Sequence, residues 1–204
     1  MLFEDKYQTI KTPTEGIFRD KGSKFIAYAY PFHQEEKLKE IIADLKNQHP
    51  KARHWCYAYR LTPNRSVFRV NDDGEPSGTA GRPILNVLLS QDLTNILVVV
   101  VRYFGGTLLG VPGLIHAYKS ATEEALTQAE IIEKRVQDIY QIYFDYAQMN
   151  DVMSLIKEEQ LESSNYQFDL SCSLKIAINQ TEVNKILTLL EHIHSVKIKY
   201  LESV

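Results

Sequence analysis

Two glycine-rich segments constrain the fold of this chain more than any other feature. The first runs from residue 72 to residue 83 and the second from residue 102 to residue 113. Each leads into an apolar pattern typical of a helix and places a proline, Pro83 or Pro112, near the expected first turn, where a missing N–H costs nothing. Free N–H groups at a helix start, with glycines that admit close approach, favour anions. Two such segments, separated by one short buried strand, indicate a built site, whereas the order of strands in the sheet decides whether both belong to one site.

Length and charge limit the partners of this chain. Its 204 residues suffice for one large or two small domains, and its net charge of −3 creates no overall basic field for nucleic acid. Residues 1–137 carry 18 Lys and Arg against 16 Asp and Glu, a balance of +2, whereas residues 138–204 carry 5 against 10, a balance of −5. The second part is therefore the poorer partner for phosphate backbones.

The cysteines and the apolar runs indicate the compartment. Cys56 and Cys172 lie far apart and predict two buried thiols in a reducing compartment rather than a disulfide framework or a metal site. The first residues are charged at once, unlike a signal peptide, and the longest aliphatic run, 96–101, is too short to span a bilayer. We expect a soluble cytoplasmic protein with no membrane partner, no metal and no cofactor; the sequence leaves the oligomeric state open.

Apolar periodicity predicts the elements of the first part. Strands are expected at 25–32, 52–61, 66–70 and 96–101, and helices at 34–48, 84–89 and from about Pro112. In the second of these strands, alternation places Trp55 and Tyr57 on one face and His54, Cys56 and Arg60 on the other. The continuous β-branched run 96–101 predicts a central strand that is buried on both faces.

The second part has a different order of elements. Strands are expected at 139–146, 166–168, 171–178 and 196–200, with helices around 149–156 and 183–190. This β-α-β-β-α-β order is that of the ferredoxin-like split arrangement. We therefore expect an α+β protein with two domains, residues 1–132 and 138–204. The segment 130–138 between them is charged and has neither Gly nor Pro, which predicts a stiff junction.

Three carboxylates crowd the first glycine-rich segment, at Asp72, Asp73 and Glu75. Three interpretations are open. The acids could bind Mg²⁺ or act as a general base; they could cap loop N–H groups and pair with Arg82 or Arg102; or they could hold arginines that face a ligand. The absence of Gly-x-x-x-x-Gly-Lys and of a Gly-x-Ser-x-Gly elbow argues against a P-loop nucleotidase and a hydrolase.

The remaining polar residues near the loops have two interpretations each. Ser77 and Thr79 could cap a helix or bind phosphate, and Arg102 could pair with the acidic loop or bind an anion through both of its terminal nitrogens. His54 is expected to be structural rather than half of a Cys–His nucleophile with Cys56. No catalytic residue is assigned. The candidate ligand-binding residues are His54, Arg60, Asp73, Glu75, Ser77, Gly78, Thr79, Gly81, Arg82, Arg102, Tyr103, Gly105 and Gly106.

The loops and the strand before them resemble the IMPACT family, whose bacterial members are often called YigZ-type proteins. The matching segments are residues 21–27, 52–60, 72–81, 83–85, 101–106, 108–110 and 113–114. The resemblance implies an N-terminal domain with the fold of the second domain of a small-subunit ribosomal protein. It also implies a C-terminal domain similar to a ferredoxin-like domain of elongation factor G.

The resemblance also carries an expectation about function. Eukaryotic relatives are translation regulators that compete for the activator of an amino-acid-starvation kinase, and for bacterial members it implies a link to ribosomes or RNA. We therefore expect a non-enzymatic, translation-associated protein whose loops bind RNA phosphate, with charge from Arg82 and Arg102. Two alternatives stay open: a Mg-dependent enzyme acting on a small phosphorylated metabolite through Asp73 and Glu75, and a protein-docking module for a ribosome-linked factor.

Overall fold

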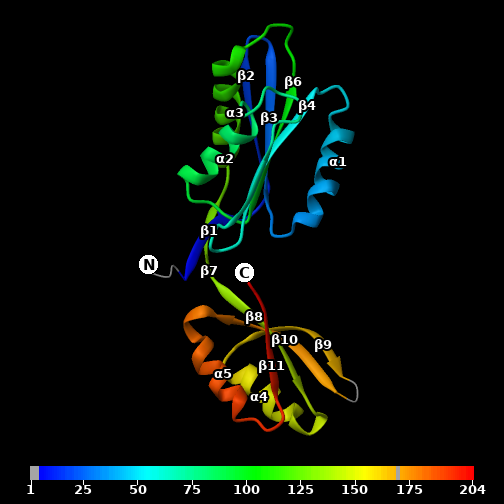
Figure 1. The fold of residues 1–204 in the computed structure, drawn as a ribbon, viewed down its shortest axis with the longest axis vertical. Coiled ribbons are helices and arrows are strands. Elements are labelled where there is room, and N and C mark those ends of the chain that lie inside the picture. Colours follow the sequence, from blue (N-terminus) through cyan, green and yellow to red (C-terminus); the bar gives the residue numbers. More distant parts are fainter. Residues whose placement is uncertain (1–4, 169–170) are drawn as a thin grey trace. The chain divides into compact units, whose positions relative to one another are not determined.

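The chain divides into two compact units. The computed structural model describes residues 5–168 and 171–204, and the mixed helix-and-sheet class is confirmed (Figure 1). The larger unit is Tyr7–Lys134, and the smaller unit comprises Arg135–Val204 together with residues 5–6. The division into domains at residues 1–132 and 138–204 stays a prediction.

The larger unit is built on a five-stranded antiparallel sheet of order β2-β3-β6-β4-β5. Its strands are β2 (Thr14–Asp20), β3 (Ser23–Pro31), β4 (His54–Leu61), β5 (Val67–Asn71) and β6 (Ile96–Tyr103). The prediction of a central buried strand is confirmed, because residues 96–101 have no exposed surface. The register pairs His54 of β4 and Phe25 of β3 with Arg102 of β6. We call this edge, with residues 20–24, 51–54, 71–82 and 102–110, the loop end.

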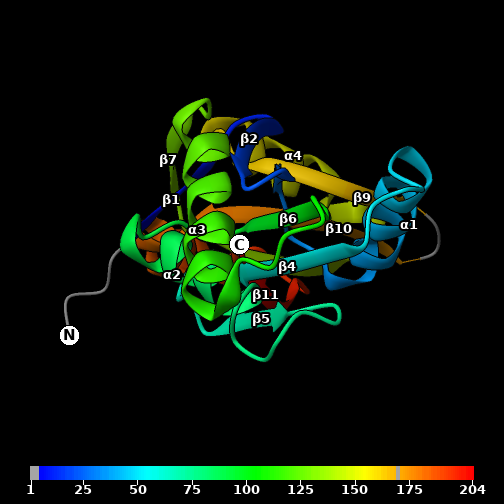
Figure 2. The same ribbon diagram turned by 90° about the horizontal axis from the view of Figure 1, so that it is seen from above.

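Helices cover both faces of this sheet (Figures 1 and 2). The helices α2 (Gly81–Ser90) and α3 (Gly110–Thr127) pack on one face. On the other face lies α1 (Leu38–Gln48), preceded by a 3-10 turn at Glu35–Lys37. The helix expected within 34–48 is confirmed, and its residues Leu38 and Leu45 are buried against Tyr57 and Tyr59 of β4. In the described part of the chain, no helix combines the length and apolarity needed to cross a membrane.

Three strands within residues 5–168 and 171–204 have no counterpart among the predicted elements. β1 (Lys6–Ile10) and β7 (Ile131–Arg135) form a two-stranded sheet, and β2 lies at the edge of the large one. β7 occupies the charged segment that the sequence predicts as a junction. β7 exposes most of its side chains and β2 buries only Gly16, so both lack the apolar alternation by which a half-buried strand is recognised.

The smaller unit has the expected β-α-β-β-α-β order. Its elements are β8 (Gln137–Phe144), α4 (Met149–Glu158), β9 (Glu162–Phe168), β10 (Cys172–Asn179), α5 (Val183–Glu191) and β11 (Lys197–Ser203), with 3-10 turns at Tyr146–Gln148 and Gln180–Glu182. The sheet order is β11-β8-β10-β9, and all neighbours are antiparallel. Val152 and Leu190 of the helices are fully buried against Ile142 and Leu174 of the sheet.

Candidate functional site

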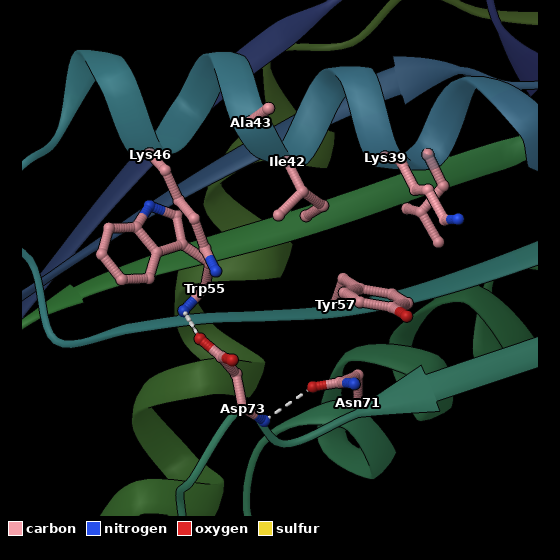
Figure 3. A pocket seen from close by; sticks show the side chains of 9 residues that line it. Lys39, Ile42, Ala43, Lys46, Trp55, Tyr57, Asn71 and Asp73 are labelled. Carbon is pink, nitrogen blue, oxygen red and sulfur yellow. Dashed lines mark hydrogen bonds between the residues drawn. The ribbon is translucent and has the colours of Figure 1, made fainter.

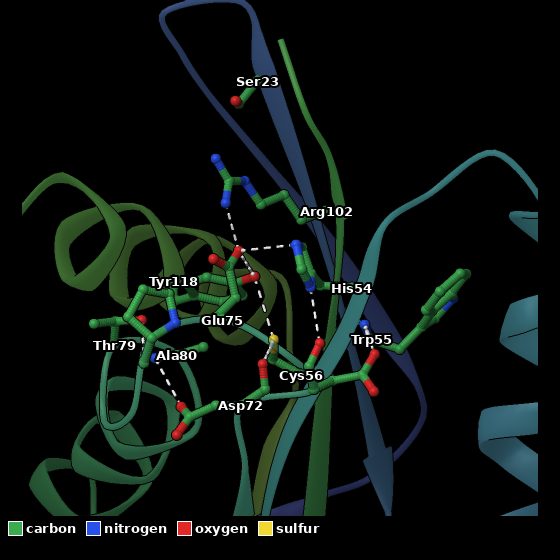
Figure 4. A network of polar contacts seen from close by, with 12 residues as sticks. Ser23, His54, Trp55, Cys56, Asp72, Glu75, Thr79, Ala80, Arg102 and Tyr118 are labelled. Atoms are coloured by element: carbon green, nitrogen blue, oxygen red, sulfur yellow. Dashed lines mark hydrogen bonds and ion pairs between the residues drawn. The ribbon is translucent and has the colours of Figure 1, made fainter. Parts of the chain in front are cut away.

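The two glycine-rich segments meet at the loop end of the larger unit (Figure 4). The guanidinium of Arg102, which begins the second segment, donates from Nη1 to Oε1 of Glu75 in the first segment at 2.5 Å. Their side chains are only 6% and 4% exposed. A buried ion pair thus joins segments that lie 27 positions apart in the chain.

Glu75 is the centre of a larger buried network. Its Oε1 also accepts a hydrogen bond from the hydroxyl of Tyr118 in α3 at 2.8 Å, and Nε2 of His54 lies 3.9 Å away. The Cys56 thiol lies 3.3 Å from that hydroxyl and 3.0 Å from the carbonyl oxygen of Asp72. Burial raises the pKa of both the Cys56 thiol and the Tyr118 hydroxyl. Both groups therefore stay protonated and act as donors, and the predicted burial of the Cys56 thiol is confirmed.

Arg102 does not present its charge to solvent. Its guanidinium carbon lies 5.3 Å from the ring centre of Phe25 and 5.6 Å from that of Phe104, and Glu75 neutralises its charge. Of the two interpretations of Arg102, pairing with the acidic loop is therefore the one that the structure shows. The expectation that Arg102 supplies charge to a phosphate is corrected, since that charge is already used inside the protein.

The carboxylate of Asp72 lies at the N-terminal end of α2. Its carboxylate accepts hydrogen bonds from the N–H groups of Gly78 at 2.8 Å, Ala80 at 3.1 Å and Gly81 at 2.8 Å. The capping interpretation is confirmed for this residue. It also corrects the expected anion site, because the amides of Gly78 and Gly81 already hold a carboxylate where a phosphate was expected.

We expect Asp72→Ala to lower the free energy of unfolding of the larger unit by about 2 kcal/mol, because three N–H groups lose one charged acceptor together. The chain has a single tryptophan, Trp55, and it lies in this unit. Its fluorescence during urea denaturation is the measurement. Ser77→Ala, an exposed change in the same loop, is the control and should alter stability by less than about 0.5 kcal/mol. Equal effects of the two variants would contradict the capping role.

Asp73 and Glu75 point to different partners. Oδ2 of Asp73 accepts the N–H of Trp55 at 2.7 Å, and the Asp73 carboxylate lies on the α1 side of the sheet. Glu75 instead faces Tyr118 of α3 on the other side. The two carboxylates therefore do not converge on one metal ion, which corrects the proposed magnesium pair. Within residues 5–168 and 171–204, no group of three or more His, Cys, Asp or Glu is arranged to hold a metal.

The other predicted residues are distributed more widely. Arg60 lies at the opposite end of β4, where Nη1 is 3.2 Å from both Oδ1 of Asp92 and the carbonyl oxygen of Leu93. This corrects its place in the site: His54 and Arg60 share a strand face, but six residues of strand separate them by about 20 Å. The other predicted residues lie at the loop end. Thr79 is hydrogen-bonded to Pro76, Tyr103 to His49 and Gly105 to Ser23. Ser77, Arg82 and Gly106 are exposed.

A groove that the sequence did not predict lies on the α1 side (Figure 3). Its volume is about 380 Å³, and its lining comes from α1, β4, β5 and the first glycine-rich segment: Leu38, Lys39, Ile42, Ala43, Lys46, Trp55, Tyr57, Asn71 and Asp73. Three separate stretches of chain form it, so only the fold brings them together. One signal was available, since Lys39, Ile42 and Lys46 recur at helical spacing on one face.

Known proteins resemble this chain over most of its length. The family model described as the Impact N-terminal domain matches residues 21–126. "IMPACT family member YvyE" of Bacillus subtilis (strain 168) is 33% identical over 87% of this chain and 82% of its own length. "IMPACT family member YigZ" of Escherichia coli (strain K12) is 33% identical over 84% and 85%. A crystal structure described as that of a hypothetical protein is 27% identical, with a TM-score of 0.78 over 98% of this chain and 99% of that one. This chain therefore belongs to the IMPACT family.

Proposed function

We propose that this protein is a translation-associated regulator that binds RNA through the loop end of its larger unit. Membership of the IMPACT family supports the link to translation, because the resemblance to that family implies that its eukaryotic members are translation regulators. We further propose the fold of the second domain of a small-subunit ribosomal protein for the larger unit and a ferredoxin-like fold for the smaller one. The β11-β8-β10-β9 sheet supports the second assignment.

The charge at the loop end carries the RNA part of the proposal. Lys21, Lys51, Arg53 and Arg82 come from three separate segments and are all exposed there. None of the four forms an ion pair with another residue of the described chain. Two of the carboxylates of the same region are engaged internally, Asp72 as a cap and Glu75 as a buried partner of Arg102. The surface thus keeps an excess of free cations, which suits phosphate groups.

The proposed site differs from the one the sequence predicts. The amides of the first segment are capped and are not available to phosphate. In the proposed site, these exposed cations and the second segment contact the phosphate groups instead. There, Gly106 is exposed, has a φ of +86° and has open space where a side chain would stand, so its backbone is open to a close contact. Arg102 acts as a positioning residue that holds the two segments together.

Filter binding with labelled single-stranded RNA at several salt concentrations tests this proposal. The affinity of the parent protein should fall linearly with salt on logarithmic axes. The triple variant Lys21→Ala/Arg53→Ala/Arg82→Ala should bind more weakly. Its slope of log affinity against log salt should be smaller in magnitude by about two, because a protein with three fewer cations displaces fewer counterions from the RNA. Lys157→Ala in the smaller unit is the matched control. Retention that is absent at low salt, or indifferent to salt, overturns the proposal.

One observation favours a second partner, a ribosome-linked protein. Four large apolar side chains of the second segment and the start of α3 are exposed: Phe104 by 46%, Leu108 by 83%, Val111 by 52% and Ile115 by 40%. Grouped apolar surface of this kind is typical of protein contacts. If this partner is the relevant one, the chain should sediment with crude ribosomes but not with salt-washed ones, and the uncharged change Leu108→Gln should abolish sedimentation without changing RNA retention.

A further inference from the structure

We infer that the groove between α1 and strands β4 and β5 binds a nucleotide, with its base stacked on Trp55 and its phosphate held by lysines of α1. The inference rests on the proposed function and extends it: the ligand is one nucleotide of the single-stranded RNA that the larger unit binds. A free mononucleotide has the same chemistry and is the other source that the experiment must distinguish.

The groove has the size and composition of a small-ligand site. Its volume of about 380 Å³ lies within the range usual for such sites. Trp55 and Tyr57 line it from consecutive positions on one face of β4, and Ile42 lines it from α1. Aromatic and apolar walls with a few polar groups are characteristic of sites for planar ligands.

The position of Lys46 shows that the Trp55 ring faces a place where a ligand can bind. The ammonium of Lys46 lies 5.2 Å from the centre of that ring, over its face (Figure 3). An exposed cation–π contact of this kind is weaker than the stacking of a base on an aromatic side chain. A base can therefore displace the ammonium, which stays within reach on its flexible stem and can pair with the phosphate of the same nucleotide.

A second cation lies further along the same wall of the groove. Lys39 and Lys46 are seven residues, or about 10 Å, apart on one side of α1. Lys39 is exposed and makes no ion pair among residues 5–168 and 171–204. Cations that flank an aromatic surface form the combination by which single-stranded nucleic acids are bound without a fixed sequence.

The side of the groove opposite α1 offers hydrogen bonds suited to the edge of a base. Oδ1 of Asn71 accepts the backbone N–H of Asp73 at 2.7 Å, which leaves the Asn71 amide group as a donor. Oδ2 of Asp73 accepts the N–H of Trp55, which leaves its other oxygen as an acceptor. A donor beside an acceptor matches the edges that bases present. The Asp73 charge also repels phosphate and so directs it towards the lysines.

Trp55 is itself the probe, because the chain has no other tryptophan. Titration with octamers of uridylate or adenylate should quench its fluorescence. Lys46→Ala should weaken binding of the fluorescein-labelled octamers, measured by anisotropy, about tenfold, and Lys46→Arg should restore most of the affinity. Trp55→Leu should cost about tenfold in the same assay, and Trp55→Phe less. Lys119→Ala, outside the groove, is the matched control, and circular dichroism confirms that each variant is folded.

The outcomes separate this inference from the proposed function. Quenching by octamers that Lys46→Ala weakens supports both. Octamers that bind by anisotropy without quenching, and with an affinity that Lys46→Ala leaves unchanged, overturn the groove assignment and leave the RNA proposal intact. Quenching by uridylate and adenylate monophosphates, with no binding of octamers, supports a nucleotide site but overturns RNA as its source. No quenching and no binding by any of these ligands overturns both.

Discussion

Replacing Arg102 with methionine is expected to lower the free energy of unfolding of the larger unit by about 3–5 kcal/mol. The reason is the charge that the replacement leaves behind. Glu75 is 4% exposed, and without Arg102 its carboxylate keeps only the hydroxyl of Tyr118 at 2.8 Å and the more distant ring of His54. A buried carboxylate without a cation is far more costly than the pair itself.

The double variant Arg102→Met/Glu75→Leu should regain a large part of that loss. Methionine can keep the contacts that the Arg102 side chain makes with Phe25 and Phe104, which lie within 6 Å of its guanidinium carbon. Replacing a whole buried pair with apolar groups is often close to neutral. Nε of Arg102 is, moreover, buried without a hydrogen-bond partner in the described structure, so the change also removes an unsatisfied donor. The difference between single and double variants measures the coupling of the two residues.

The measurement is chemical denaturation followed by Trp55 fluorescence, with an exposed ion pair as the control. Lys119 and Glu123 are separated by 3.6 Å, and their side chains are 57% and 47% exposed. Lys119→Met should therefore change stability by less than about 0.5 kcal/mol. If Arg102→Met costs no more than Lys119→Met, then the pair with Glu75 does not hold the two segments together.

The elements that sequence could predict are those with a strong apolar period. The helix at Leu38–Gln48 places Leu38 and Leu45 one above the other, and the strand at Ile96–Tyr103 is apolar on both faces. β2 could not be recognised in this way. It is an edge strand that exposes Ile17, at 45%, and buries Gly16, which has no side chain to reveal a pattern.

The sequence indicates a site at the two loops, but it predicts neither that the loops meet, which depends on strand order, nor the role of each carboxylate. Asp72, Asp73 and Glu75 stand within four positions and look equivalent in sequence. In the fold, the carboxylate of Asp72 caps the start of α2, that of Asp73 lies in the groove beside Trp55, and that of Glu75 pairs with Arg102. Asp73 has a φ of +41°, a conformation that reverses the direction of the chain there. The Asp73-Gly74 pair is typical of such a turn, but the side of the sheet that each acid reaches is decided by the elements that pack around the turn.

Gly16→Ala is expected to be the second most destabilising of these changes, at about 3 kcal/mol. A Cβ at this position would lie 2.1 Å from the backbone nitrogen of Ala125 and 2.6 Å from the carbonyl carbon of Glu124, both in α3. The hydroxyl of Thr14 donates to the carbonyl oxygen of Ala125 at 2.9 Å and keeps the helix close to β2. The added methyl group therefore forces strand and helix apart.

The cost of Gly16→Ala should come from packing alone. The φ of Gly16 lies outside the left-handed region, so alanine is acceptable to the backbone and even restricts the unfolded chain. Gly78→Ala is the complementary control, because its φ is +76° and nothing lies within 4 Å of the new carbon. It should cost about 1–2 kcal/mol through backbone strain only. Adding Ala125→Gly should not rescue Gly16→Ala, since the clash is with backbone atoms, and a full rescue by that second change would show that side chains, not the helix backbone, set the distance between β2 and α3.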